Sequence, residues 1–257
     1  MTARVRLRFY EELNDFLAPA LRKREFDYAC ARAASVKNAI EAVGVPHTEV
    51  ELILVNGESV DFSCRLRDGD HVSVYPTFER FDIAPLLRLR ERPLRQPRFI
   101  ADVHLGGLAR LLRMVGFDTL HDSGYRDAEI RAVAGAEHRI VLTRDRELLK
   151  CRDVTHGCYV RALKPAAQLR EVVERLQLGS HLAPFTRCLR CNLPLVPATG
   201  EEARSKVPPA IAAEYARFAR CPGCGRVYWK GGHWRRMREL LARSLGEAPP
   251  AAEEPGP

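Results

Sequence analysis

Four cysteines in the last third of the chain have the spacing of a metal site. They form two motifs, Cys188-x-x-Cys191 and Cys221-x-x-Cys224. Each motif can present two thiolates from one tight turn, and two such motifs make the closed tetrahedral site typical of structural Zn²⁺. The 29 residues between them exceed the usual spacer of about 15 to 20 residues, and we interpret the excess as an insertion with a helix at 208–218. The pairing favours zinc over the alternative, a pair of redox dithiols.

The second candidate site consists of aspartates in the middle of the chain. Each follows a predicted strand or begins the next helix: Asp102 after 98–101, Asp122 after 117–120, Asp127 at the start of 127–136, and Asp145 after 139–143. Because the C-terminal ends of parallel strands share one edge of a sheet, we expect these carboxylates to gather there. Oxygen ligands suit Mg²⁺ or Mn²⁺, and such a cation can polarise a phosphodiester and activate the attacking water.

These four aspartates are the predicted catalytic acids, with Asp102 and Asp145 as the main Mg²⁺ or Mn²⁺ ligands. The alternative is structural, because Asp102, Asp127 and Asp145 each precede a predicted helix and could cap its free N–H groups. A catalytic role is favoured because all three caps would lie on the same edge of the sheet.

An aromatic and basic segment follows the second cysteine motif. Both tryptophans of the chain, Trp229 and Trp234, lie in R-V-Y-W-K-G-G-H-W-R-R-M-R. Aromatic side chains on a basic background are typical of single-stranded RNA binding, where bases stack and cations neutralise phosphates. We therefore predict that Trp234, Arg235 and Arg236 bind RNA. The alternative, packing of the tryptophans against the domain that precedes this segment, is favoured for Trp229.

Hydrophobic periodicity indicates which elements position these residues. Residues 1–78 predict strands at 5–9, 24–28, 51–55 and 71–75, with a helix after the N-cap Ser35. This order indicates a β-grasp domain. Residues 98–180 alternate strands with helices at 105–115, 127–136, 145–149 and 165–176, and the last strand is at 157–160. Such alternation predicts an α/β domain, a parallel sheet with helices on both faces.

The remaining segments complete the predicted organisation. Residues 79–97 form an arginine- and proline-rich connector, which is either a phosphate-binding stripe or a solvated linker. A zinc ribbon with a basic aromatic helix is predicted at 181–245, and a disordered tail at 246–257. The four cysteines outside the motifs are interpreted as buried thiols: Cys30, Cys64, Cys151 and Cys158.

In the first third of the chain, L-V-N-G-E is followed by L-R-D-G-D-H-V-S-V-Y-P. With these motifs, this part of the chain resembles the ubiquitin-like sulfur carriers of molybdopterin and thiamine synthesis. Those carriers end in a free Gly-Gly carboxylate, whereas here the chain continues through Tyr75-Pro76-Thr77-Phe78. No carboxylate is available for activation at that point. The resemblance therefore implies a structural or docking module, with a protein partner as one possibility.

A longer resemblance covers the middle of the chain. The segments F-I-A-D-V-H-L-G-G-L-A-R-L-L-R-M-V-G-F-D-T and L-T-R-D-R-E-L-L resemble the Mut-seven C-terminal RNase domain, a branch of the PIN-like nucleases. The resemblance runs from about 98 to 238, and bacterial and archaeal members carry a ubiquitin-like domain in front. It implies a PIN-like, metal-dependent ribonuclease whose acids map onto Asp102 and Asp145, and less directly onto Asp122 and Asp127. The resemblance also implies that Arg110, Arg113 and Arg144 hold phosphate groups.

Charge and composition agree with an RNA partner without identifying it. The chain has 41 basic and 33 acidic residues, a formal charge of +8, and its basic residues are nearly all arginine. Arginine matches phosphate geometry, although a preference for arginine codons explains the same excess. No apolar run approaches the ~20 residues of a membrane span. We expect a cytoplasmic protein without a membrane partner.

Three functions are consistent with these patterns. The first is a ribonuclease that hydrolyses RNA phosphodiester bonds at a Mg²⁺ or Mn²⁺ site, assisted by a zinc ribbon. The second is a non-catalytic RNA-binding or adaptor protein whose aspartates are only helix caps. The third, a docking protein related to sulfur transfer, is disfavoured by the missing carboxylate.

Overall fold

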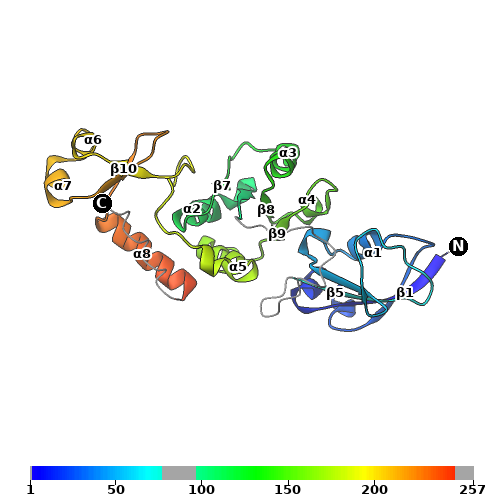
Figure 1. Ribbon diagram of the computed structural model, residues 1–257. Helices are drawn as coiled ribbons and strands as arrows, with labels where there is room; N and C mark the ends of the chain where they lie inside the picture. Colours follow the sequence, from blue (N-terminus) through cyan, green and yellow to red (C-terminus); the bar gives the residue numbers. More distant parts are fainter. Residues whose placement is uncertain (1, 77–96, 247–257) are drawn as a thin grey trace. The chain divides into compact units, whose positions relative to one another are not determined.

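The computed structural model describes residues 2–76 and 97–246 (Figure 1). The predictions for the connector 79–97 and the tail 246–257 therefore fall almost entirely outside the described residues. The chain divides into two compact units, one of residues 1–95 with 143–159 and the other of residues 96–142 with 160–257. Thus a segment from the middle of the chain groups with the N-terminal domain.

The N-terminal domain has the predicted β-grasp order. Its strands and helix are β1 (Thr2–Phe9), β2 (Phe26–Ala31), α1 (Val36–Ala42), β3 (Leu52–Val55), β4 (Glu58–Ser59) and β5 (His71–Tyr75). Short 3-10 turns lie at η1 (Glu11–Phe16), η2 (Pro19–Leu21) and η3 (His47–Glu49). The sheet order is β2-β1-β5-β3-β4, in which β1 and β5 are parallel and the other pairs are antiparallel. The fold prediction for this part is confirmed.

The core of this domain follows from the period-two pattern of β1. Val5, Leu7 and Phe9 are buried, while the residues between them are exposed. They pack in one hydrophobic cluster with residues of α1, including the fully buried Ile40. Ser35 caps α1 as predicted, because its side chain accepts a hydrogen bond from the backbone N–H of Asn38 at 3.2 Å.

The following segment alternates strands and helices. Its elements are β6 (Phe99–Ala101), η5 (Val103–Leu105), α2 (Gly106–Met114), β7 (Thr119–Leu120), α3 (Asp127–Glu137), β8 (Ile140–Thr143), α4 (Arg146–Lys150), β9 (Gly157–Tyr159) and α5 (Pro165–Arg175). The strand order is β7-β6-β8-β9, and β6 pairs in parallel with both β7 and β8. The α/β prediction is confirmed.

The strand order also determines where the helices lie. Strands β7 and β8 lie on opposite sides of β6 in the sheet. The connection from β6 to β7 and the connection from β7 to β8 therefore cross the sheet in opposite directions. Since such crossovers are right-handed, α2 and α3 cover opposite faces of the sheet. Helix α2 packs against α5 (Figure 1). This approach requires glycine, because a Cβ at Gly107 would lie 2.6 Å from Pro165 Cγ.

The C-terminal part contains the cysteine motifs. After η6 (Leu178–His181) come β10 (Val196–Ala198), α6 (Gly200–Arg204), α7 (Pro209–Glu214), β11 (Phe218–Arg220), β12 (Val227–Tyr228) and α8 (Gly232–Leu245). The prediction of one helix over 208–218 is wrong at its C-terminal end. Tyr215 is extended, and Phe218 begins a strand that pairs with β10 and β12. The backbone hydrogen bonds of this antiparallel sheet replace those of a longer helix.

Candidate functional site

The four cysteine thiols converge on one point. Their sulfur atoms all lie within 4.8 Å of one another, and Cys188 and Cys221 are fully buried. A tetrahedron of Zn–S bonds of about 2.3 Å requires sulfur atoms about 3.8 Å apart. The distance between the sulfur atoms of Cys188 and Cys224 is 3.7 Å. The geometry and the ligand type therefore fit a metal such as zinc.

Electrostatics at this site favour one thiolate before any metal is considered. Burial raises the pKa of Cys188, but hydrogen bonds from Tyr228 and from the backbone of Cys191 and Arg190 outweigh this effect and lower the pKa to about 6. The Tyr228 hydroxyl lies 3.1 Å from Cys188 Sγ. The pKa of Cys191 is raised to about 12, mainly by hydrogen bonding with Cys224 and to a smaller extent by desolvation. The contact of Tyr228 with Cys188 could not be predicted from the sequence, because no spacing rule connects Tyr228 to the cysteine motifs.

Arg113 was predicted to bind phosphate, whereas in the structure its guanidinium donates to backbone carbonyls. Its side chain is buried, with 9% exposed, because it extends from α2 to the backbone of the first cysteine motif. The guanidinium donates to the carbonyl of Thr119 at 2.8 Å, and to those of Leu189 and Arg190 at 3.2 and 3.1 Å. Arg113 therefore joins the end of α2 to β7 and to the cysteine motif.

A second polar link connects the same motif with the sheet. Asn192 is buried, and its side-chain oxygen accepts a hydrogen bond from the N–H of Thr119 at 2.9 Å. Its amide donates to Asp118 at 2.6 Å, and Asp118 also accepts from Arg139 at 2.7 Å. Burial raises the pKa of Asp118, but the hydrogen bonds from Arg139 and Asn192 outweigh this effect and lower it. Asp118 thus pairs with Arg139.

Asp102 and Asp145 both cap helical turns. Asp102 directly follows β6 and is 8% exposed, and its Oδ1 accepts from the N–H of Val103 at 2.6 Å. Asp145 is exposed and is the N-cap of α4, where its Oδ1 accepts from the N–H of Glu147 at 2.8 Å. Both residues therefore have the structural role of a helix cap. A carboxylate has two oxygens with about four lone-pair positions, so a cap does not by itself prevent metal binding.

Asp122 and Asp127 differ from this pair. Both are exposed, and Asp122 closes a turn by accepting from the N–H of Gly124 at 2.8 Å. Asp127 is the first residue of α3, whose N-cap is Arg126, so the capping alternative does not hold for Asp127. Within the described residues, only the four cysteines bring three or more possible ligands together, so the acids form no such group.

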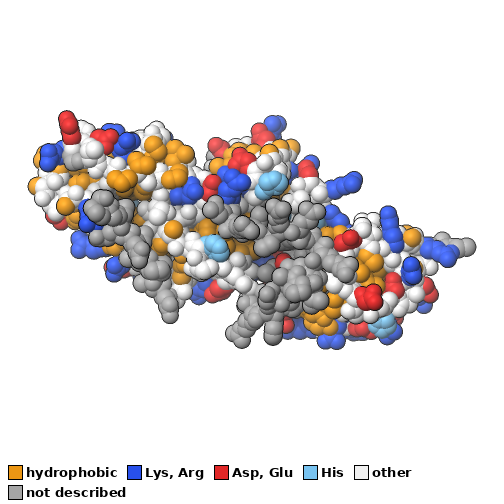
Figure 2. Space-filling model, in the orientation of Figure 1, with side chains coloured by type: hydrophobic (Ala, Val, Ile, Leu, Met, Phe, Trp, Pro, Cys, Tyr) orange, Lys and Arg blue, Asp and Glu red, His pale blue; other side chains and the backbone are white. Residues whose placement is uncertain are grey.

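The other predicted RNA-binding arginines are on the surface. Arg110 and Arg144 are exposed, as are Arg235 and Arg236 on α8. Figure 2 shows basic side chains distributed over the visible face among acidic ones, rather than gathered in a single patch. The basic excess of the sequence therefore does not by itself mark one binding surface on this face.

The two tryptophans have different surroundings. Trp234 is half-buried, with its ring 5.4 Å from that of Phe185 and the guanidinium of Arg238 over it at 5.3 Å. Trp229 contacts the ring of Phe218 in β11 at 6.4 Å. The position of Trp229 beside the small sheet agrees with a packing role, whereas Trp234 lies at the start of the basic helix α8.

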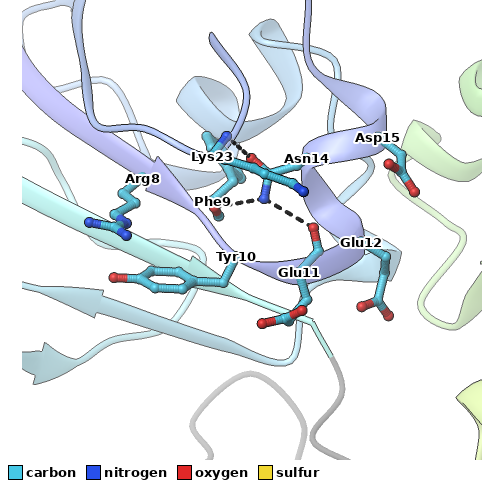
Figure 3. A pocket seen from close by; sticks show the side chains of 8 residues that line it. All are labelled: Arg8, Phe9, Tyr10, Glu11, Glu12, Asn14, Asp15 and Lys23. Atoms are coloured by element: carbon cyan, nitrogen blue, oxygen red, sulfur yellow. Dashed lines mark hydrogen bonds between the residues drawn. The ribbon is translucent and has the colours of Figure 1, made fainter. Parts of the chain in front are cut away.

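A hollow at the end of β1 is a separate feature (Figure 3). It is lined by Arg8, Phe9, Tyr10, Glu11, Glu12, Asn14, Asp15 and Lys23. Asn14 donates to the carbonyls of Phe9 and Glu11, both at 3.0 Å, and accepts from the N–H of Lys23 at 2.6 Å. These bonds hold the backbone of the turn together, and the lining carries charges of both signs. We assign no chemistry to this hollow.

Comparisons with known proteins agree with this architecture. Residues 97–241 match the family described as the Mut7-C RNAse domain, which is more than half of the chain. Residues 2–82 match the Mut7-C ubiquitin domain. No curated protein matches the chain. In the described part of the chain, no helix is long and apolar enough to cross a membrane. The match to the RNAse domain supports a nuclease-like function, and the chain belongs to the Mut7-C RNAse domain family.

Proposed function

We propose that the protein is a metal-dependent ribonuclease with Asp102 and Asp145 as its principal metal ligands. The family membership supports a nuclease, and the positions of the two residues at strand ends support this choice of acids. Asp122 and Asp127 are proposed as further acids near the reaction. Because both are exposed, they can contact the RNA or a water molecule bound to the metal without binding the metal directly.

The single observation that carries the proposal is the register of β6 and β8. These parallel neighbours pair Ala101 with Leu142, and the N–H of Asp102 donates to the carbonyl of Leu142 at 2.9 Å. Asp102 is the residue after β6, and Asp145 lies three residues beyond Leu142 along the chain. Strand order reverses between β6 and β8, and in open parallel sheets ligands bind outside the carboxyl ends of the strands at such a point.

The chain's own residues have distinct roles in this proposal. The caps fix one oxygen of Asp102 and one of Asp145, which orients both carboxylates. A bound Mg²⁺ or Mn²⁺ supplies Lewis acidity and lowers the pKa of water. Arg144 and Arg110, both exposed, are proposed to hold phosphate groups of the RNA.

The zinc ribbon is proposed to extend the RNA surface. Trp234 offers a half-buried aromatic face at the start of α8, and Arg235 and Arg236 follow on the same helix. Stacking on an aromatic ring tolerates any base, which suits single-stranded RNA. The zinc at the four cysteines is structural in this proposal, because all four coordination positions are taken by protein.

The test is cleavage of end-labelled single-stranded RNA by the full-length chain with and without Mn²⁺. The protein is first treated with EDTA to remove bound metal. Because EDTA also removes zinc, the treated protein then receives either Zn²⁺ alone or Zn²⁺ together with Mn²⁺. We expect cleavage only when Mn²⁺ is restored. Asparagine caps helices about as well as aspartate, so Asp102→Asn should lower kcat by at least about 100-fold with little loss of stability. Metal-dependent cleavage by Asp102→Asn at the wild-type rate would show that the site is wrongly assigned.

A second candidate function is favoured by a specific observation. Both Asp102 and Asp145 already serve as helix caps, so their presence is explained without a metal. In that case the chain is a non-catalytic RNA-binding or adaptor protein. Tight RNA binding without cleavage under Mg²⁺, Mn²⁺ or Zn²⁺ would support this function over the first.

A further inference from the structure

The β-grasp domain contacts a segment of the RNAse domain about 100 residues away in the sequence. The turn η3 of the β-grasp domain packs on α4 and β9, and all three lie in the same compact unit. His47, Thr48 and Glu49, which form η3, are all buried, with 3–6% exposed. Three polar side chains in a row are rarely this buried unless each has hydrogen-bond partners.

His47 connects the two segments through both of its ring nitrogens. Nδ1 lies 2.7 Å from a carboxylate oxygen of Glu41, and Nε2 lies 3.0 Å from the carbonyl oxygen of Val154. Glu41 lies in α1 and Val154 lies in the segment after α4, so the ring bridges the two segments. The Val154 side chain is also fully buried, so apolar packing accompanies this polar contact.

The next two residues hold the ends of the same segment. The hydroxyl of Thr48 donates to the carbonyl of Leu149 in α4 at 3.4 Å. The carboxylate of Glu49 accepts from the backbone N–H of Tyr159 in β9 at 2.6 Å. A Cβ at Gly157 would lie 2.4 Å from Leu149 Cδ2, so a side chain at this position would displace the Leu149 side chain.

A cation–aromatic cluster adds a further contact. Arg146, the first residue of α4, has its guanidinium over the rings of Phe16 at 5.1 Å and Tyr159 at 5.4 Å. The two rings meet edge to face with their centres 5.4 Å apart. Arg146 immediately follows Asp145, so this contact lies next to the proposed metal ligand.

We propose that η3 of the β-grasp domain is a positioning element for α4, and that it holds the Asp145 carboxylate in its catalytic position. This inference rests on the proposed function. Helix α4 has only five residues, too few to be stable alone, so its position depends on packing. Its buried residues Leu148 and Leu149 supply part of that packing, and η3 supplies the polar part. Asp145 is attached to α4 through its cap, so a displaced helix displaces the carboxylate.

The test compares three variants of the full-length chain. Glu49→Leu removes the acceptor for the Tyr159 N–H, whereas Glu49→Gln keeps an oxygen there and should rescue most of the loss. Ile40→Val is the matched control, because it loosens the β-grasp core while the hydrogen bonds from η3 to α4 and β9 keep their donors and acceptors. The readouts are kcat and KM for single-stranded RNA, and amide hydrogen exchange of residues 143–159.

We expect Glu49→Leu to lower kcat by about 10- to 100-fold with KM nearly unchanged, since small displacements of a catalytic group have effects of this size. Exchange should increase across 143–159 in Glu49→Leu and not in Ile40→Val. Unchanged exchange in Glu49→Leu, or faster exchange with wild-type kcat, would overturn the inference alone. If Glu49→Leu does not fold, His47→Gln, which alters the contact to the Val154 carbonyl, is judged by the same criteria. Absence of cleavage by the wild-type chain would overturn the proposed function, and this inference with it.

Discussion

The two candidate metal sites of this molecule are built in different ways. The four cysteines come from two tight turns, and their sulfur atoms all lie within 4.8 Å of one another. The aspartates come one at a time after separate strands, and none of the described acids joins a group of three or more ligands. A structural site must be assembled by the fold itself, whereas a catalytic site must leave room for water and substrate. Convergence of side chains therefore identifies a structural metal site more readily than a catalytic one.

The largest expected effect comes from breaking the cysteine site. Cys188→Ser removes a buried ligand with a lowered pKa, and we expect loss of zinc and unfolding of the ribbon, because structural zinc contributes directly to folding. Metal analysis and thermal unfolding measure both effects. Cys64→Ser is the control and should keep the full zinc content, since Cys64 is not one of the converging thiols. Equal zinc content in both variants would remove the distinction between the two kinds of cysteine.

A smaller but substantial effect is expected at the link between the ribbon and the sheet. Arg113→Met leaves the carbonyls of Thr119, Leu189 and Arg190 without this donor, at a cost of about 1–3 kcal/mol for each group that stays buried and unsatisfied. We therefore expect a clear fall in the denaturation midpoint. Arg110→Met, on the exposed side of α2, should leave the midpoint unchanged and weaken RNA binding instead. The opposite pattern would restore Arg113 as a phosphate-binding residue.

The smallest expected effect concerns the pH dependence of the same link. The pKa of Asp118 is lowered in the folded protein, so its stabilising effect is present above the ordinary pKa of aspartate and is lost as pH falls through the folded value. We expect Asp118→Asn to be less stable than the wild type near neutral pH. The difference should shrink on acidification below about pH 4, near the pKa of free aspartate. Asp68→Asn is an exposed control, and a difference that stays constant with pH would contradict the assignment.

Local patterns predicted the elements that depend on neighbouring residues. The alternation in β1, the cap at Ser35 and the two cysteine motifs each involve contacts within a few residues of the chain. The parallel sheet followed from alternating strands and helices. These features could be predicted because their physical causes are contained within short windows of sequence.

Features that depend on distant residues could not be predicted in this way. On the periodicity of α2 alone Arg113 resembles an exposed arginine, but carbonyls about 76 residues away in the cysteine motif make it a buried donor. Asn192 and His47 find their partners at similar or greater distances. The helix predicted over 208–218 ends early because Phe218 pairs with strand β10 instead. In each case the tertiary partner outweighs the local preference.

The most direct test of the central claim is a crystal structure of the full-length chain soaked in Mn²⁺, with anomalous scattering used to locate the ion. The account predicts an ion bound by carboxylate oxygens of Asp102 and Asp145, in addition to zinc at the four cysteines. Ligand distances of about 2.0–2.2 Å would identify direct coordination. Mn²⁺ bound elsewhere, or absent from both aspartates at saturating concentration, would contradict the proposed catalytic site.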